Sequence, residues 1–197
     1  MIQKIGTEYG SHYIDLDRLR PGDTIIDCGV GRDISFAAGL PAATLALNFI
    51  FIDPDQSCED FISKSMQNYR FIHGAAHSHG LSTAIYQGKP DSSSSIYPDH
   101  RAVTENHQYI KAVNIPELCN DIHAAGGRVG CLKLDVEGAE YYILNMDITA
   151  DQITVEFHHG FIESIKLKQT IAIVRKLSAR YTYFTADGRE YLFTLKS

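Results

Sequence analysis

Tryptophan is absent from this 197-residue chain, cysteine is scarce, and basic residues are not in excess. The four cysteines have no short paired spacing, which is not the pattern of a zinc framework or a secreted disulfide scaffold; they are Cys28, Cys58, Cys119 and Cys131. We expect reduced thiols in a cytoplasmic protein. The formal net charge of -6 offers no general attraction to nucleic acid or to an anionic membrane, so neither is expected as a partner.

Long hydrophobic runs are also missing. No stretch reaches the roughly 18 uninterrupted apolar residues that a membrane-spanning helix needs. Residues 1–8 lack the apolar core of a signal peptide. The length suits one domain, 1–197, because a chain of roughly 150 residues already buries about two-thirds of its extended surface.

What the chain does have is a set of short apolar runs that end in acidic residues, at 24–27, 49–53 and 131–135. Continuous apolar runs of this length are typical of buried parallel strands. The carboxyl ends of such strands share one edge of the sheet, where open α/β folds bind their ligands. Three acid-tipped strands therefore predict one crevice.

Strand and helix patterns alternate along the rest of the chain, which predicts an α/β fold with a mostly parallel sheet. Further strands are expected at 69–72, 82–87, 109–113 and 152–157, and helices from 34, at 58–67, at 115–125, at 138–146 and at 161–178. A C-terminal antiparallel hairpin is expected from 181–185 and 190–195. Residues 1–22 would cover the domain, and the serine-rich segment 88–98 would be a mobile loop that could act as a lid.

A glycine-rich turn follows the first acid-tipped strand and consists of Gly29, Val30 and Gly31. Glycines let the backbone approach a ligand closely. Asp27 before the turn suits a cationic amine, and Asp53 at the end of the next strand suits the two hydroxyls of a ribose. S-adenosylmethionine carries both groups. Ile34 replaces the third glycine of nicotinamide sites, which disfavours an NAD-dependent oxidoreductase. Each aspartate alone could instead cap a turn.

Three segments, 29–36, 132–140 and 154–159, together resemble the FkbM-type methyltransferases. The sequence Lys-Leu-Asp-Val-Glu-Gly-Ala-Glu within the second segment is the specific part of this resemblance. Tyr9-Gly10-Ser11 and 51–54 extend it over nearly the whole chain. The resemblance implies a class I fold, which is Rossmann-like and doubly wound with a seven-stranded sheet, together with S-adenosylmethionine as cofactor. It also implies methylation of hydroxyl oxygens on sugars or secondary metabolites.

The resemblance assigns cofactor contacts residue by residue. The methionine end would be held by Asp27 and the glycine turn, and the ribose by Asp53 with Pro54 beside it. The adenine would be bordered by Ala75, Ala76 and His77. Arg32 departs from the family pattern, which favours glutamate at that position.

Four polar residues are expected to converge at the reaction edge. Asp135 and Glu137 are two positions apart, so they share a face if the strand continues, and Glu156 and His158 do the same on the next expected strand. In this interpretation Asp135 lies beside the transferred methyl group. His158 or Glu156 then accepts the proton of the substrate hydroxyl.

Other polar residues are given structural roles. Glu140 would complement the N-terminus of the helix that begins near Gly138 and face the helix surface. The remaining histidines are expected at the surface or in packing; they include His73, His77, His79, His100, His107, His123 and His159. Asp135, Glu156 and His158 could hold a metal chemically, but carboxylates with one imidazole do not select a metal from sequence, so no metal is expected.

We therefore expect an S-adenosylmethionine-dependent methyltransferase that acts on a hydroxyl oxygen of a small molecule or glycan. One alternative is a nucleoside-cofactor-binding module without transfer activity, and a less favoured one is the NAD-dependent oxidoreductase. The aromatic residues between 161 and 193 suit a core or a subunit contact, and a core is the preferred interpretation. The sequence is compatible with a homo-oligomer and does not decide between a monomer and an oligomer.

Overall fold

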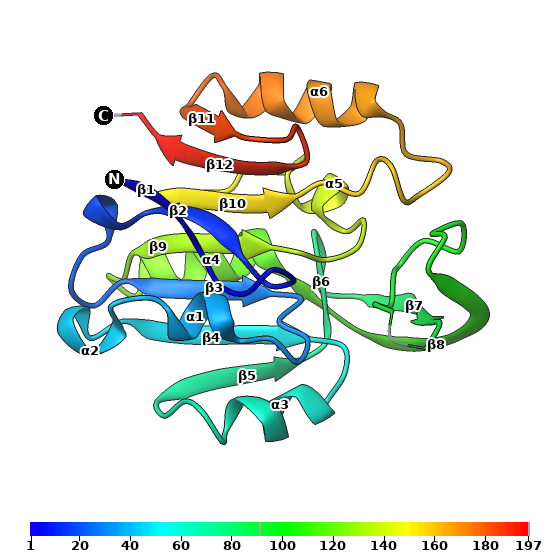
Figure 1. The fold of residues 1–197 in the computed structure, drawn as a ribbon, viewed down its shortest axis with the longest axis horizontal. Helices are drawn as coiled ribbons and strands as arrows, with labels where there is room; N and C mark the ends of the chain where they lie inside the picture. The colour runs from blue at the N-terminus through cyan, green and yellow to red at the C-terminus, as the bar shows by residue number, and fades with distance from the viewer. Residues whose placement is uncertain (91, 197) are drawn as a thin grey trace.

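The structure, a computed structural model, describes residues 1–90 and 92–196, and one large sheet dominates it (Figure 1). The parallel strands are β3 (Thr24–Cys28), β4 (Asn48–Asp53), β5 (Tyr69–His73), β9 (Val129–Leu134) and β10 (Gln152–Glu156). The antiparallel strands are β11 (Tyr181–Thr185) and β12 (Glu190–Leu195). The order is β11-β12-β10-β9-β3-β4-β5. The predicted α/β class with a large, mostly parallel sheet is confirmed.

The central strands are apolar because the sheet is covered on both faces. Every residue of β3 and of β9 is buried. Neighbouring side chains alternate between two cores: Ile25 packs in one hydrophobic cluster and Ile26 in the other. Two charged residues, Asp27 and Lys133, interrupt these otherwise apolar strands, and they pair with each other.

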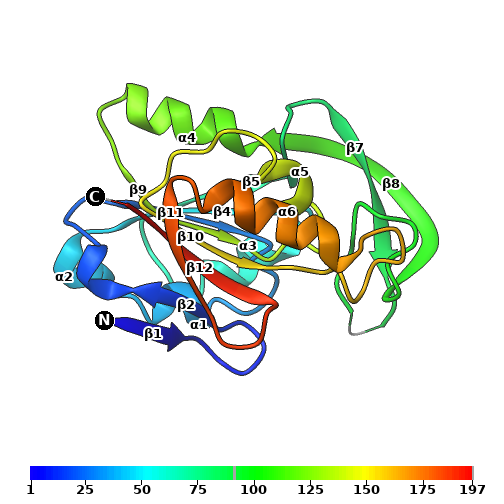
Figure 2. The same ribbon diagram turned by 90° about the horizontal axis from the view of Figure 1, so that it is seen from above.

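Helices lie on both faces of the sheet (Figure 2). One face is covered by α1 (Ser35–Ala38), α2 (Ala42–Leu45) and α3 (Ser57–Ile62). The opposite face is covered by α4 (Ile115–Ala124), α5 (Glu140–Ile143) and α6 (Leu167–Leu177). Within residues 1–90 and 92–196, no helix is both long and apolar enough to cross a membrane.

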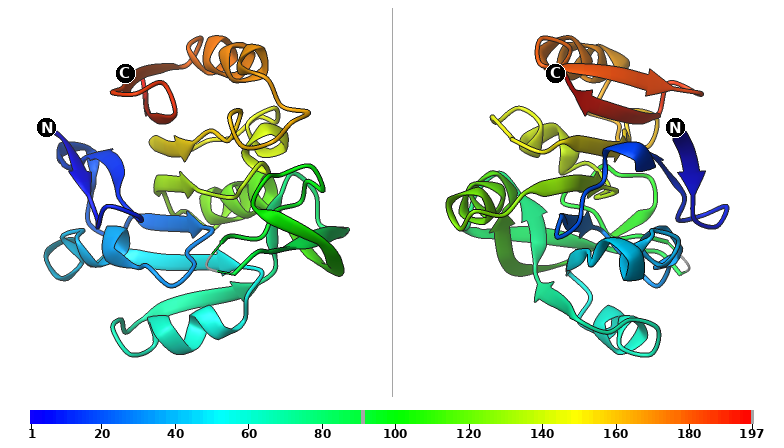
Figure 3. Two further views of the ribbon diagram at one scale, coloured as in Figure 1. Left: turned by 45° about the vertical axis from the view of Figure 1, so that its right-hand side comes forward. Right: turned by 90° about the vertical axis from the view of Figure 1, so that its left-hand side faces the viewer.

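The N-terminal segment forms an antiparallel ribbon of β1 (Ile2–Ile5) and β2 (His12–Asp15), followed by the 3-10 turn η1 (Leu16–Arg18). The ribbon lies beside the main sheet (Figure 3), where β2 contacts β10 and β12. The side-chain oxygen of Gln152 accepts a hydrogen bond from the backbone N–H of Asp15 at 2.8 Å. The ribbon is thereby fixed against β10.

A second sheet projects from the carboxyl end of the main sheet as an arm, seen at the right of Figure 1. It consists of β6 (Ala75–His77), β7 (Ser82–Gly88) and β8 (Val103–Asn114), in the order β6-β8-β7. The expected extended segment at 109–113 is only part of β8. The predicted loop 88–98 includes position 91, which lies outside the described residues. Beyond that position, Ser95 pairs with Tyr86 across the arm.

Three helices are shorter than expected, and the one expected at 58–67 already ends at Ile62. The helix expected at 161–178 begins only at Leu167. Ahead of it, the Phe161 carbonyl accepts a hydrogen bond from Arg101, and Ile162 forms a β-bridge with His100. The helix expected at 138–146 is confined to α5, because a tight turn precedes it.

Candidate functional site

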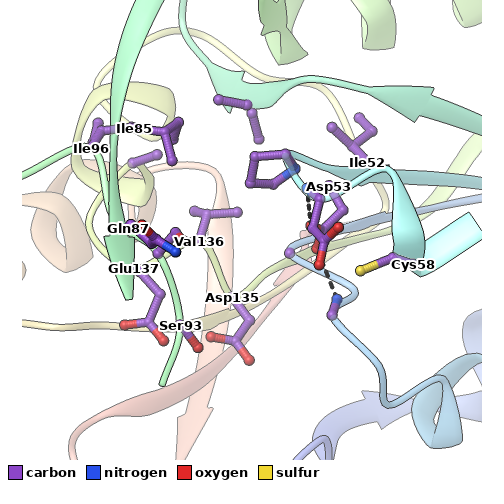
Figure 4. Close-up of a pocket in the computed structure, with 18 of the residues that line it drawn as sticks. Ile52, Asp53, Cys58, Ile85, Gln87, Ser93, Ile96, Asp135, Val136 and Glu137 are labelled. Atoms are coloured by element: carbon purple, nitrogen blue, oxygen red, sulfur yellow. Dashed lines mark hydrogen bonds between the residues drawn. The ribbon is translucent and has the colours of Figure 1, made fainter. Parts of the chain in front are cut away.

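The candidate site is a cleft at the carboxyl ends of the parallel strands. Strands β3, β4 and β5 follow one another toward one edge of the sheet, whereas β9 returns to the other side of β3. Open α/β sheets bind ligands at such a reversal point. The cleft has a volume of about 1050 Å³. Asp53 lies on one side of it, and Asp135 and Glu137 lie on the other (Figure 4).

The turn after β3 depends on glycine at two positions. Gly29 has φ +74°, and a Cβ there would lie 1.7 Å from the carbonyl oxygen of Asp135, so no other residue fits. Gly31 has φ +56°, and a Cβ there would meet nothing within 4 Å. Gly31 lines the cleft, so its backbone is accessible to a ligand.

Asp53 is buried at the end of β4 and still lines the cleft. Its Oδ2 accepts a hydrogen bond from the backbone N–H of Gly31, and its Oδ1 accepts one from Asp55, each at 2.8 Å. Burial raises the pKa of Asp53 despite these bonds. Each carboxylate oxygen can accept more than one hydrogen bond, so Asp53 keeps capacity for a ligand hydroxyl.

The expected cofactor residues divide into two groups. Those that line the cleft are Gly29, Gly31, Asp53, Pro54, Ala75, Ala76 and Asp135. Asp27, Val30 and His77 do not line it. Val30 is buried in the core beneath the turn. The His77 ring stacks on Tyr142 at 5.0 Å, and burial lowers its pKa to about 4.

Asp27 forms a buried ion pair with Lys133. Its Oδ1 accepts a hydrogen bond from Lys133 Nζ at 2.7 Å, and Lys133 also lies 3.4 Å from the Gly29 carbonyl. Burial alone would lower the pKa of Lys133, but attraction by Asp27 and Asp135 outweighs it and raises that pKa. This placement differs from the amine contact expected of Asp27: its carboxylate holds Lys133 beneath the glycine turn.

The four polar residues of the expected reaction edge do come together. One ligand-type atom from each of Asp135, Glu156 and His158 lies within 4.8 Å of the others. Glu137 Oε2 lies 3.2 Å from His158 Nε2. Asp135 and Glu137 line the cleft, whereas Glu156 and His158 lie behind them. Arg189 is ion-paired with Glu156.

Glu140 does not face the helix surface, contrary to expectation. It is 0% exposed, and its Oε1 accepts hydrogen bonds from the backbone N–H and from Nδ1 of His158, each at 3.0 Å. Its Oε2 accepts from the Gly138 N–H at 2.8 Å. Glu137 and Gly138 both have positive φ, and this turn directs the first side chain of α5 inward. The contribution of Glu140 is to orient His158.

The surrounding carboxylates set the charge of His158. Burial alone would lower the pKa of His158, but Glu140, Glu137 and Asp135 raise it to about 10. His158 in this arrangement holds a proton at neutral pH, which does not suit the proton-accepting role expected for it. Burial would raise the pKa of Asp135, but His12, Lys133 and His158 hold it well below its usual range.

Two further histidines, His12 and His100, lie beside the carboxylates of Asp135 and Glu137. His100 was expected at the surface or in packing. His100 is buried, and its Nε2 lies 3.0 Å from Glu137 Oε2. His12 is buried on the N-terminal ribbon, with Nε2 3.8 Å from Asp135 Oδ2. Neither histidine has a recognisable signal in its local sequence. Lys133 does have one, because a lysine inside a buried apolar run requires a carboxylate partner.

Comparison with known proteins identifies a family and a structurally similar protein. A family model described as the methyltransferase FkbM domain matches residues 14–185. A crystal structure of a fibrillarin/NOP5P complex is similar with a TM-score of 0.48 and 8% identity, over 91% of this chain and 75% of that chain. No curated protein matches this chain.

Proposed function

The chain belongs to the FkbM methyltransferase domain family, and we propose that it transfers a methyl group from S-adenosylmethionine to a hydroxyl oxygen of a small molecule or glycan. The observation that carries this proposal is that a single cleft joins two groups of residues. The glycine turn and Asp53 lie at the ends of β3 and β4, and Asp135 and Glu137 lie at the end of β9. Nucleoside recognition and proton removal can therefore act on neighbouring parts of one bound complex.

The residues of the cleft fit this cofactor. Asp53 offers carboxylate oxygens to the ribose hydroxyls, and the accessible backbone at Gly31 allows close approach of the ligand. Ile52 and Ala76 provide an apolar lining where a flat base can pack. The cleft volume of about 1050 Å³ is at the upper end of the range of about 300–1,000 Å³ typical of ligand sites. It leaves room for an acceptor beside the cofactor.

S-adenosylmethionine supplies a methyl group that is already activated. The protein then has to align the acceptor and remove its proton. Among the cluster carboxylates, Asp135 and Glu137 line the cleft and are accessible to an acceptor hydroxyl. We assign proton removal to these two. His158 pairs with both of them at the back of the cleft, and Glu156 lies beside this group and pairs with Arg189.

The far wall of the cleft supports a hydroxylated acceptor. It carries amide and hydroxyl side chains from the arm, namely Gln87, Ser92, Ser93, Ser94, Asn106 and Gln108. Such uncharged groups donate and accept hydrogen bonds, which suits sugar-like or polyol substrates. Ser95 Oγ donates to the Glu137 carbonyl at 2.5 Å, which links this segment to the reaction edge.

Calorimetry of Asp53→Ala tests the cofactor site. The substitution removes charge-assisted hydrogen bonds, so we expect S-adenosylmethionine affinity to fall by roughly 1.5 to 3 kcal/mol. Asp60→Ala, which changes an exposed acid of α3, is the matched control and should bind like wild type. Wild-type protein that binds NAD but neither S-adenosylmethionine nor its demethylated product would refute the proposal.

A further inference from the structure

The outermost strand of the main sheet, β11, has an open edge. Within residues 1–90 and 92–196, β12 is the only strand that pairs with β11. Strand β11 lies beside α6 at the end of the sheet farthest from β5 (Figure 1). An edge strand presents unpaired backbone N–H and C=O groups with which another chain can pair. We propose that β11 pairs with β11 of a second copy of this chain and that a symmetric homodimer results.

The register of β11 on β12 shows which backbone groups face the open edge. The backbone N–H of Lys196 donates to the carbonyl of Arg180 at 3.0 Å. Alternate residues of an antiparallel strand bond to the same neighbour, and residues 182 and 184 therefore bond to β12 as Arg180 does. The N–H and C=O groups of Tyr181, Tyr183 and Thr185 consequently point outward.

The outward groups are symmetric about Tyr183, which favours a second copy as the partner. Antiparallel pairing about a two-fold axis at this residue places Tyr183 opposite Tyr183 of the other copy, and Tyr181 opposite Thr185. Every outward N–H then has a carbonyl partner. Exposed Arg180 precedes the strand and exposed Asp187 follows it, so this register also brings unlike charges together at both ends of the paired strands. Two-fold dimers use the same surface on both subunits in this way.

The side chains of β11 do not protect the edge against pairing. Charged residues and proline are the usual protection of an edge strand, and residues 181–186 contain neither. Tyr183 is 52% exposed, and Phe184 is exposed on the other face of the strand. The opposite edge strand, β5, differs because it carries exposed Arg70. Aromatic and β-branched side chains favour pairing with another strand.

Helix α6 extends the apolar surface beside this edge. Lys176 Nζ donates to the carbonyl oxygens of residues 144–146, so its side of α6 faces α5. Leu167, Ile171 and Val174 lie on the other side of the helix, because they follow the i, i+4, i+7 spacing of one face. Leu167 and Ile171 are exposed. The two-fold axis places this stripe against the same stripe of the second copy, which removes apolar side chains from water.

The homodimer does not depend on the proposed methyl transfer. Among the described residues, none from β11 or α6 lines the cleft. Pairing at this edge therefore leaves the lining of the cleft unchanged in both copies.

Sedimentation velocity of the full-length protein over a series of concentrations tests the dimer. We expect wild type to sediment as a dimer. Tyr183→Lys should raise the dissociation constant by about tenfold or more, because two ammonium groups then lie opposite each other across the axis. Ile171→Lys should also weaken the dimer, since it places charge in the apolar stripe of α6. Tyr109→Lys, at an exposed tyrosine of β8 in the arm, is the matched control and should dimerise like wild type.

Cross-linking tests the register. Tyr183→Cys places two thiols opposite each other at the axis, where the Cβ atoms of directly paired residues are about 4.5 to 5.5 Å apart. The native cysteines are buried and should not compete. A short bis-maleimide should therefore link Tyr183→Cys chains in pairs and leave Tyr109→Cys chains unlinked.

Circular dichroism establishes that each variant is folded. Wild type that sediments as a monomer at every concentration would overturn the dimer. Equal dissociation constants for wild type, Tyr183→Lys and Ile171→Lys would also overturn it, as would a wild-type dimer whose Tyr183→Cys variant is not cross-linked, because the interface would then lie elsewhere.

Discussion

The buried ion pair between Asp27 and Lys133 gives a quantitative prediction. Asp27 is 1% and Lys133 2% exposed, and the two charged groups are 2.7 Å apart. At an effective dielectric constant of about 20, the attraction at this distance is about 6 kcal/mol. Burying two ions costs several kcal/mol each, so the pair as a whole contributes little net stability. Each partner nevertheless depends strongly on the other.

Lys133→Met removes the cation and leaves Asp27 buried without compensation. We expect this change to lower the free energy of unfolding by about 3 to 5 kcal/mol. Asp27→Asn should cost a similar amount, because it leaves the lysine unpaired. The double variant Asp27→Asn/Lys133→Met should regain most of the loss, since no uncompensated charge is then buried. Lys64→Met, at an exposed position, should change stability by less than about 0.5 kcal/mol.

Urea unfolding at pH 7 measures all four variants, with the linear extrapolation to water giving each free energy. A loss below about 1 kcal/mol for Lys133→Met would refute the energetic argument, because an unpaired buried carboxylate costs more than that. The double variant also tests the role of Asp27. Unchanged S-adenosylmethionine affinity would support Asp27 as a positioning residue, whereas a large loss in the folded double variant would restore the amine contact.

Two further predictions concern chemistry and pH. Asp135→Asn should keep S-adenosylmethionine affinity but lower the rate of methyl transfer by about 10² to 10⁴-fold if Asp135 takes part in proton removal, and an unchanged rate would exclude that role. The folded pKa of His77 is about 4, below the ordinary 6.5, so its contribution to stability is present above pH 6.5 and is lost as pH falls toward 4. Wild type should therefore lose stability relative to His77→Phe over that interval; parallel pH curves of unfolding free energy would contradict this.

Local sequence signals account for the elements that were predicted well. The strand at 181–185 and the strand at 190–195 are separated by Asp187-Gly188, a turn signal that acts over a few residues. The acid-tipped strands were equally readable, because a continuous apolar run that ends in aspartate needs no distant partner to be recognised. The helix expected from residue 161 failed for the opposite reason: His100 and Arg101, some 60 residues earlier, hold residues 161 and 162 in another conformation.

The same distinction explains the site. Asp53, Gly29 and Gly31 were correctly expected to border the cleft, because their placement follows from position within a strand and a turn. Glu140 was assigned to the helix surface because its partner, His158, lies 18 residues away. The burial of Glu140 depends on the turn before α5, in which Glu137 and Gly138 have positive φ, and the sequence did not predict these values. Long-range charge pairing is therefore where a single sequence gives least information.

The contact between Gly29 and Asp135 has a consequence for protein engineering. A Cβ at Gly29 would lie 1.7 Å from the Asp135 carbonyl oxygen. The glycine turn after β3 and the end of β9 are therefore in direct backbone contact, with no room for a larger side chain. Substitutions at Gly29 or Asp135, which form the floor of the cleft, would disturb both sides of the cleft at once. The arm is different, because Gln87, Asn106 and Gln108 reach the cleft from a separate sheet. Libraries intended to accept new substrates should vary these three positions and keep the floor constant.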